Sequence, residues 1–170
     1  MNELNDIWEQ MLESAIAKAE ISGNHNVAEY LKLKATNDAI RTESSKWLFE
    51  TLLETAHSFL QKGVNIVIEN ENPHRFEMNK ATVVGSLLRF RQGLRCLTIE
   101  IGWTRTPSDG FMRGNALAFG KISHFGMSKK NVELHLAKLN DIPTWFLIND
   151  ENRETLLLQH LDEHFSQFVG

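Results

Sequence analysis

Two stretches in the first third of the chain carry apolar residues at the spacing of an amphipathic helix. The first stretch covers residues 4–19, where glutamates occupy the positions opposite the apolar stripe. The second covers residues 42–62, and its stripe is Trp47, Leu48, Leu52, Ala56, Phe59 and Leu60. We predict a helix over each, with turns at Ser22–Asn24 and Gly63, and a short helix over residues 27–34 between them.

After the second helix the apolar residues alternate with polar ones, which is the period of a β-strand. The pattern predicts a strand over residues 64–68, a loop over residues 70–73 and a short strand around Phe76 and Met78. The later strands are expected in meander order, each beside the previous one. Their predicted ranges are 81–91, 94–105, 111–125, 131–139 and 143–149.

A C-terminal helix is predicted after the last strand, with an apolar stripe made of Leu157, Leu161, Phe165 and Phe168. Asp150 is expected to cap this helix, and Glu151 and Glu154 to lie in its first turn. The fold class is therefore α+β: N-terminal helices, then a mainly antiparallel meander sheet of about five to seven strands, closed by a C-terminal helix. One domain over residues 1–170 is expected, because no linker or repeat interrupts the pattern.

Two turn signals predict how three of the strands pair. Gln92-Gly93 is expected to form a two-residue hairpin loop. The pairs that follow from it are Leu88 with Leu97, Ser86 with Ile99, and Val84 with Ile101. Residues 107–110 are expected to form a four-residue turn, which pairs Ile101 with Ala116, Ile99 with Ala118, and Leu97 with Gly120. Both turns place Leu97, Ile99 and Ile101 on the buried face of the sheet.

Small residues line the same buried face in the strand predicted over residues 111–125. They are Gly114, Ala116, Ala118 and Gly120. A helix packed closely against this strip is the favoured interpretation, because glycine within a strand commonly marks close backbone packing. A ligand that approaches the strip is the alternative.

The opposite, outer face of the predicted sheet mixes charged and large apolar side chains. It is expected to present Arg89, Arg91, Thr98, Glu100, Leu117, Phe119, Lys121, His135 and Phe146. A face that is fully exposed to water would carry fewer large apolar residues. We therefore expect the C-terminal helix, a second subunit or a ligand to cover part of it.

The composition favours a globular protein of the cytoplasm. Of the 170 residues, 42% are hydrophobic, which is enough to form a core. Cys96 is the only cysteine, so no disulfide can form within the chain, and a buried, unreactive thiol is expected. The first residues are acidic and precede no apolar run, which argues against a signal peptide. No stretch approaches the roughly 18 apolar residues of a membrane span, so no membrane partner is expected.

The charges are unevenly distributed, although the net charge is only −4. Residues 75–130 hold ten lysines and arginines against three acids, a net charge of +7, and the remainder carries −11. Six of the eight arginines lie in the basic segment. This asymmetry points to an anionic partner, or to the pairing of opposite charges within the fold or between two copies of the chain.

Arg89 and Arg91 are the leading candidates for ligand binding. They lie two residues apart on one strand, so both project to the outer face, where Phe119 is also expected. Two guanidinium groups beside an aromatic ring can hold a phosphate, a carboxylate or a stacked base. The alternative is that the arginines form ion pairs with Glu100 and Glu133.

Residues 102–115 combine two arginines, an acid, a tryptophan and three glycines, and form the second candidate region. Arg105 and Arg113 project to opposite faces of the predicted hairpin, so they cannot act as one clamp, although each alone can bind an oxyanion. The alternative is a structural hairpin tip in which Asp109 accepts backbone hydrogen bonds.

Neither a metal site nor a cofactor is predicted. His160 and His164 have the helical spacing of paired zinc ligands, but the glutamate of the metalloprotease motif is missing and no third ligand stands near. The chain has no glycine-rich phosphate loop and no nucleophile elbow. His124 and His135 lie on neighbouring strands and could act as bases, although neither has a nucleophile beside it.

Three functions are compatible with these features. The favoured one is a non-enzymatic intracellular binding protein that takes an anionic small molecule or a protein partner on its arginine-rich sheet face. An enzyme of unassigned reaction class, with its site near residues 102–115 or on the outer face, is the second, and a nucleic-acid-binding protein is the third and less favoured one. The candidate ligand-binding residues are Arg89, Arg91, Glu100, Arg105, Arg113, Phe119 and His135. A homodimer is also expected, because closed two-fold dimers are the commonest oligomers.

Overall fold

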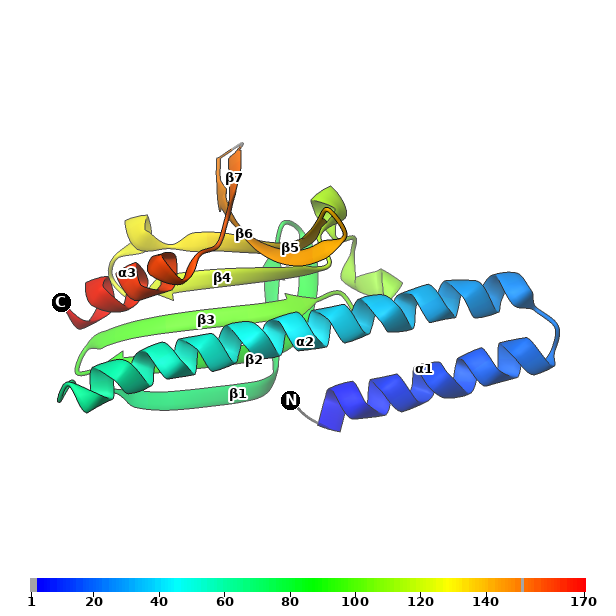
Figure 1. Cartoon of the computed structure of the whole chain (residues 1–170), viewed down its shortest axis with the longest axis horizontal. Coiled ribbons are helices and arrows are strands. Elements are labelled where there is room, and N and C mark those ends of the chain that lie inside the picture. Colours follow the sequence, from blue (N-terminus) through cyan, green and yellow to red (C-terminus); the bar gives the residue numbers. More distant parts are fainter. Residues whose placement is uncertain (1–2, 151) are drawn as a thin grey trace. The chain divides into compact units, whose positions relative to one another are not determined.

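The protein is described here by a computed structural model that covers residues 3–150 and 152–170. It confirms the predicted α+β class, with helices first, then an antiparallel sheet and a C-terminal helix (Figure 1). Internal contacts divide the chain into two compact units, residues 1–46 and 47–170. One domain over the whole chain therefore stays a prediction. No helix within the described ranges is both long and apolar enough to cross a membrane.

The first unit contains α1 (Glu3–Ile21) and the beginning of α2 (His25–Gln61). The two helices are linked by a side-chain hydrogen bond in which Trp8 Nε1 donates to Asp38 Oδ2 at 3.0 Å. Asp38 Oδ1 also accepts from Arg41 Nη1 at 2.7 Å. The indole, the carboxylate and the guanidinium group thus form one chain of contacts between the helices.

The two helices predicted over residues 27–34 and 42–62 form the single helix α2. The break predicted between them was wrong. Residues 35–41 contain neither glycine nor proline, so no residue in this segment removes a backbone donor or strongly disfavours a helix. Thr36, Asn37 and Asp38 have low intrinsic helix propensity, yet the helix runs through them.

The second unit contains the end of α2, the sheet and α3 (Leu158–Val169). Within the described ranges the sheet has seven strands in sequence order, each antiparallel to the next, which confirms the predicted meander (Figure 1). The strands are β1 (Val67–Met78), β2 (Ala81–Gln92), β3 (Arg95–Trp103), β4 (Ala118–His124), β5 (Val132–Leu139), β6 (Ile142–Asn149) and β7 (Asn152–Thr155).

Strand β1 replaces the two short strands and the loop that were predicted before residue 80. Its pairing with β2 is shifted between Glu71 and His74, where Asn72 and Pro73 lie opposite the single residue Ser86, so a β-bulge accommodates one extra residue. Proline within a strand is tolerated at an edge or at a bulge, and β1 offers both. The polar and proline-containing segment therefore bends the strand without ending it.

The start of the C-terminal helix was also predicted wrongly. Asp150 has a positive φ of 50° and lies in the turn after β6, so it does not cap α3. Glu154 lies in β7, and Glu151 lies outside the described residues. The helix begins at Leu158, because the chain first adds β7 to the edge of the sheet.

The β2–β3 hairpin turns one residue later than predicted. Gln92 pairs with Arg95, so the loop consists of Gly93 and Leu94, and Gly93 takes the positive φ that such a loop requires. Every pairing is displaced by two residues from the prediction. The actual partners are Leu88 with Ile99, Ser86 with Ile101, and Val84 with Trp103. Because side chains alternate with a period of two, the displacement leaves each residue on its predicted face.

The connection between β3 and β4 is longer than the predicted four-residue turn. It contains two short 3-10 helices, η1 (Pro107–Asp109) and η2 (Arg113–Asn115), while a third, η3 (Ser128–Lys130), follows β4. The β3–β4 pairs are therefore displaced by four residues: Ile101 with Gly120, Ile99 with Ile122, and Leu97 with His124. The faces are again unchanged, although Gly114 and Ala116 of the predicted strip lie before the strand.

The helices of the second unit cover the face that was predicted to be buried. Leu97, Ile99 and Ile101 are at most 1% exposed. The Phe165 ring of α3 lies 4.9 Å from that of Phe90, which projects to the same face as Leu97, and 5.9 Å from the Phe59 ring of α2. The C-terminal helix therefore covers the core face, and the alternative that it covers the outer face is wrong.

We expect the substitution Ala118→Leu to lower the free energy of unfolding by about 1–3 kcal/mol, because three added carbons must fit into a close-packed core. Ala118 has no exposed surface and pairs with Leu136, which is equally buried. Urea denaturation would measure the change, with Ser123→Leu, half-buried on the opposite face of β4, as the control. An unchanged denaturation midpoint for Ala118→Leu would contradict close packing at this position.

Candidate functional site

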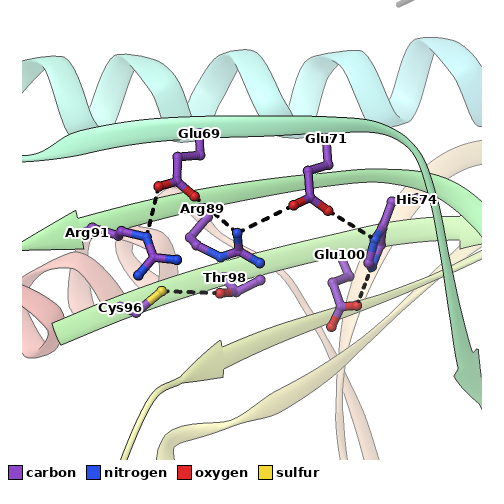
Figure 2. A network of polar contacts seen from close by, with 8 residues as sticks. All are labelled: Glu69, Glu71, His74, Arg89, Arg91, Cys96, Thr98 and Glu100. Atoms are coloured by element: carbon purple, nitrogen blue, oxygen red, sulfur yellow. Dashed lines mark hydrogen bonds and ion pairs between the residues drawn. The ribbon is translucent and has the colours of Figure 1, made fainter. Parts of the chain in front are cut away.

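Six ionisable side chains form a connected group on the outer face of β1, β2 and β3 (Figure 2). We call this group the crease network: Glu69, Glu71, His74, Arg89, Arg91 and Glu100. Two more polar side chains of β3 lie beside it, Cys96 and Thr98, whose Sγ and Oγ1 atoms are 3.6 Å apart. The thiol is half-buried, so the prediction of a buried cysteine was wrong.

Glu69 bridges the two arginines. Arg89 Nη1 donates to Glu69 Oε2 at 3.1 Å, and Arg91 Nε donates to Glu69 Oε1 at 2.9 Å (Figure 2). Arg89 Nη1 also lies 3.6 Å from Glu71 Oε1. The strand register explains these contacts, because Glu69 pairs directly with Arg89, and opposite charges on facing residues attract across a sheet.

The electrostatics of this group follow from the bridge. The hydrogen bond from Arg89 holds the pKa of Glu69 below its ordinary value, and the same bond raises the pKa of Arg89. With His74 neutral, the three carboxylates outweigh the two guanidinium groups by one charge. The basic character that the sequence showed for Arg89 and Arg91 is thus balanced by acids from β1, which lie outside the basic segment.

His74 is held between two of the carboxylates. Its Nε2 atom lies 2.7 Å from Glu100 Oε2, and its Nδ1 atom lies 3.7 Å from Glu71 Oε2 (Figure 2). The ring also stacks on Phe76, with 5.6 Å between the ring centres. His74 and Glu100 each keep less than a fifth of their side-chain surface exposed. Contacts on three sides therefore fix the orientation of the imidazole.

A sharp bend of the sheet positions His74, and we call this bend the crease. His74 follows the bulge in β1 and pairs with Gly85 of β2, which in turn pairs with Gly102 of β3. A Cβ atom on Gly85 would collide with the carbonyl oxygen of Ile101, and one on Gly102 would lie 2.9 Å from the carbonyl carbon of Val84. The backbones approach so closely at this point that only glycine fits. The bulge and the two glycines together allow the sheet to bend.

Packing on the outer face continues beyond the crease. Residues of β1 and β2 beyond the crease contact residues of β4 and of the β3–β4 connection in one buried cluster: Met78, Ala81, Val83, Ala116 and Phe119, with Phe76 and Met112 against it. Phe119 lies opposite Gly102 of β3, which has no side chain, so the Phe119 ring can meet the residues of β2 across β3. The outer face is therefore covered at this end by the chain itself.

The other predicted site residues lie apart from the crease network. Phe119 is fully buried, and its ring centre is 4.8 Å from that of His135. The Arg105 guanidinium group lies 3.9 Å from the centre of the Trp103 ring and donates to the Val84 carbonyl oxygen, through Nη2 at 2.9 Å. Arg113 is exposed in η2. The structure thus brings together Arg89, Arg91 and Glu100, and the remaining four residues do not belong to this group.

Residues 104–110 behave as the structural tip that was the alternative to a binding loop. Asp109 Oδ2 accepts hydrogen bonds from the backbone nitrogens of Arg105 at 3.0 Å and Thr106 at 3.2 Å. The bond from the Arg105 backbone is the main reason why the pKa of Asp109 lies below its ordinary value. The Asp109 carboxylate therefore stabilises the turn through these backbone hydrogen bonds.

Two histidines that were considered as metal ligands have other contacts. His160 Nδ1 accepts from the Leu157 backbone nitrogen at 2.8 Å, and His160 Nε2 lies 3.0 Å from Glu154 Oε1. His164 points into the core, where it meets His124 of β4. Within the described ranges, no three side chains of histidine, cysteine, aspartate or glutamate are placed to hold a metal ion.

Sequence reasoning missed Glu69, Glu71 and His74. The loop predicted over residues 70–73 separated them from the sheet, although Val67, Glu69 and Glu71 alternate in the way that a strand requires. The sequence feature that could have identified them is the spacing of Glu69 and Glu71, which lie two residues apart as Arg89 and Arg91 do on the neighbouring strand. Comparison of the chain with family models, curated proteins and solved structures gave no match. Function is therefore inferred from the crease network alone.

Proposed function

We propose that this chain is a non-enzymatic, cytoplasmic binding protein that holds an anionic group of a small molecule or of a protein partner at Arg89 and Arg91. The observation that carries the proposal is the bridge, in which one carboxylate contacts both guanidinium groups. The arginines are therefore already spaced and oriented to share one carboxylate. A ligand carboxylate or phosphate would take the place that Glu69 occupies.

The bridging carboxylate is accessible enough to be exchanged. The Glu69 side chain is 40% exposed and that of Glu71 is 53% exposed, while Arg91 is 48% exposed. An ion pair of this kind contributes little to stability, because water and salt screen the charges. Displacing Glu69 by a ligand would thus cost little, and the carboxylate would return to solvent.

We expect Glu69→Gln to bind inorganic phosphate or an acidic peptide about two- to fivefold more tightly than the unmodified chain does, because the internal competitor loses its charge. Arg89→Lys should lose most of the binding, since an ammonium group cannot bind an oxyanion in a bidentate manner. Isothermal titration calorimetry would measure both. Glu77→Gln is the matched control, because Glu77 is an exposed glutamate of the same strand outside the network.

Two results would contradict the proposal. The first is the absence of measurable binding of either probe by both the unmodified chain and Glu69→Gln. The second is equal tightening by Glu69→Gln and by Glu77→Gln, because this would reduce the effect to the loss of one negative charge anywhere on β1.

One contact favours the enzyme alternative, which places the site at the outer face. An imidazole held by a carboxylate, as His74 is by Glu100 at 2.7 Å, is an arrangement that supports general-base chemistry. The contacts of His74 within the described residues are with Glu71, Glu100 and Phe76, none of which is a hydroxyl or thiol nucleophile, so binding remains the favoured proposal. Nucleic-acid binding is the least favoured function, because a glutamate neutralises the charge of the arginine pair that would contact phosphates. The homodimer remains a prediction.

A further inference from the structure

Two histidines meet in the core where α3 packs on the sheet, on the face opposite the crease network. His164 of α3 is 9% exposed and His124 of β4 is 3% exposed. The Nε2 atom of His124 lies 2.8 Å from the Nδ1 atom of His164, and the two rings stack with their centres 5.1 Å apart. The contact therefore joins α3 to the fourth strand through a single hydrogen bond.

The position of the proton in this bond follows from the surroundings of His124. A neutral imidazole carries one N–H, so one ring donates and the other accepts. His124 Nδ1 is buried and has no partner among the described residues. If this atom carried the proton, a buried N–H would be left without an acceptor, which is costlier than a bare acceptor. We therefore assign His124 Nε2 as the donor and His164 Nδ1 as the acceptor.

An additional proton, beyond the one that His124 donates to His164, cannot be placed on either ring without a cost. On His164 Nδ1 it would set two N–H groups against each other across 2.8 Å and break the bond. On His124 Nδ1 it would create a buried cation whose new N–H has no acceptor. Protonation therefore acts directly against the contact that holds α3.

The charged surroundings oppose protonation as well. Burial lowers the pKa of His164 to about 4, and the charges of His124, His160 and Lys130 act in the same direction. Burial, reinforced by Lys130, also lowers the pKa of His124. His160 is itself paired with Glu154.

The elements packed on α3 also present cations. Lys62 of the segment after α2 lies over the Phe59 ring, which stacks on Phe165, and Arg95 of β3 donates to the Phe168 carbonyl oxygen at 3.3 Å. The acids of α3, Asp162 and Glu163, are exposed. Within the described ranges no carboxylate contacts either imidazole, so none compensates an added proton.

The helix can leave its place without disturbing the sheet. Within the described residues, each of the seven strands forms its backbone hydrogen bonds with its neighbouring strands. The helix α3 takes no part in this ladder. In the part of the chain that the structure describes, the contacts that join α3 to the sheet and to α2 are the histidine pair, the bond from Arg95, the His160–Glu154 ion pair and the packing of the rings of Phe165, Phe90 and Phe59. Detachment therefore breaks side-chain contacts and leaves the ladder hydrogen bonds intact.

We propose that α3 is an acid-released latch: proton uptake by the His124–His164 pair detaches the helix from the sheet and exposes its apolar face, while the strands stay paired. In the detached state, His164 on the helix and His124 on β4 are both exposed to water and regain ordinary pKa values near 6.5. The detached state therefore binds more protons than the docked state as the pH falls from about 6.5 toward 4, so acid favours release.

Hydrogen exchange read by mass spectrometry tests the latch on the unmodified chain between pH 7 and pH 4.5. The protection factor of residues 158–169 is expected to fall about tenfold per pH unit below pH 6 for each proton taken up, while β4 and β5 keep their protection. His164→Leu removes the titrating acceptor and should flatten this pH dependence. His57→Leu, an exposed histidine of α2, is the matched control and should leave it unchanged.

Three outcomes would overturn the latch. One is a protection factor of α3 that stays constant between pH 7 and pH 4.5. Another is simultaneous loss of protection in α3 and in the strands, which is global acid unfolding. The third is a fall of unchanged steepness in both His164→Leu and a second variant, His124→Leu. The first two outcomes are measured on the unmodified chain, so the test does not depend on the stability of either variant.

Discussion

Replacing Phe165 by alanine is expected to lower the free energy of unfolding by about 3–5 kcal/mol, which is the usual cost of removing a buried phenylalanine. The Phe165 side chain has no exposed surface. Its ring lies 4.9 Å from that of Phe90, 5.9 Å from that of Phe59 and 6.3 Å from that of Phe168, so it joins α2, α3 and β2.

Urea denaturation followed by circular dichroism would measure this loss. Leu158→Ala is the matched control, because Leu158 lies on the same helix and is 60% exposed. It should change the free energy of unfolding by less than about 0.5 kcal/mol. If the two variants were equally stable, α3 would not be docked through Phe165, and the latch proposed for the histidine pair would lose its structural basis.

The second large effect is expected at the crease. Gly85→Ala should cost about 3 kcal/mol or more, at the upper end of the cost of overpacking, because the added methyl group meets a backbone atom that cannot rotate away. That atom is the carbonyl oxygen of Ile101, and the Ile101 carbonyl carbon and the Gly102 Cα are 2.8 and 2.7 Å from the same methyl position. Relief requires β2 and β3 to separate or the bend to open.

Gly120→Ala is the control for this prediction, since Gly120 is also a buried glycine within a strand. Its added Cβ would lie 3.1 Å from the Leu134 Cβ, and a small shift relieves such a contact. Thermal denaturation of both variants should therefore show a clearly larger loss for Gly85→Ala. Equal losses would mean that the sheet is not bent at Gly85. Opening the bend would also move His74 away from Glu100, so the NMR signals of the His74 ring should shift in Gly85→Ala alone.

The type of each long element could be predicted from the sequence, and so could the face to which each strand residue projects. Both follow from the spacing of apolar residues, which is a local property of the chain. Leu97, Ile99 and Ile101 are buried as expected, although their predicted partners were displaced by two residues on one side and by four on the other. Even displacements preserve the face, which explains why a wrong register gave a correct core.

The same alternation placed Arg89, Arg91 and Glu100 together on the outer face. It did not identify the acids that pair with the arginines. The predicted partners were Glu100 and Glu133, and the structure gives Glu69 and Glu71 instead. Both acids belong to β1, part of which was predicted as a loop because it contains a proline and several polar residues.

Only the tertiary structure decided the partners of the candidate site. Whether Pro73 ends a strand or forms a bulge depends on the neighbouring strand, because Gly85 and Gly102 must be aligned beside it for the sheet to bend. Which face α3 covers depends on contacts between residues far apart in the sequence, such as Phe165 with Phe59 and Phe90. Local periodicity determines which side of an element is apolar, and the mutual packing of the elements determines what that side meets.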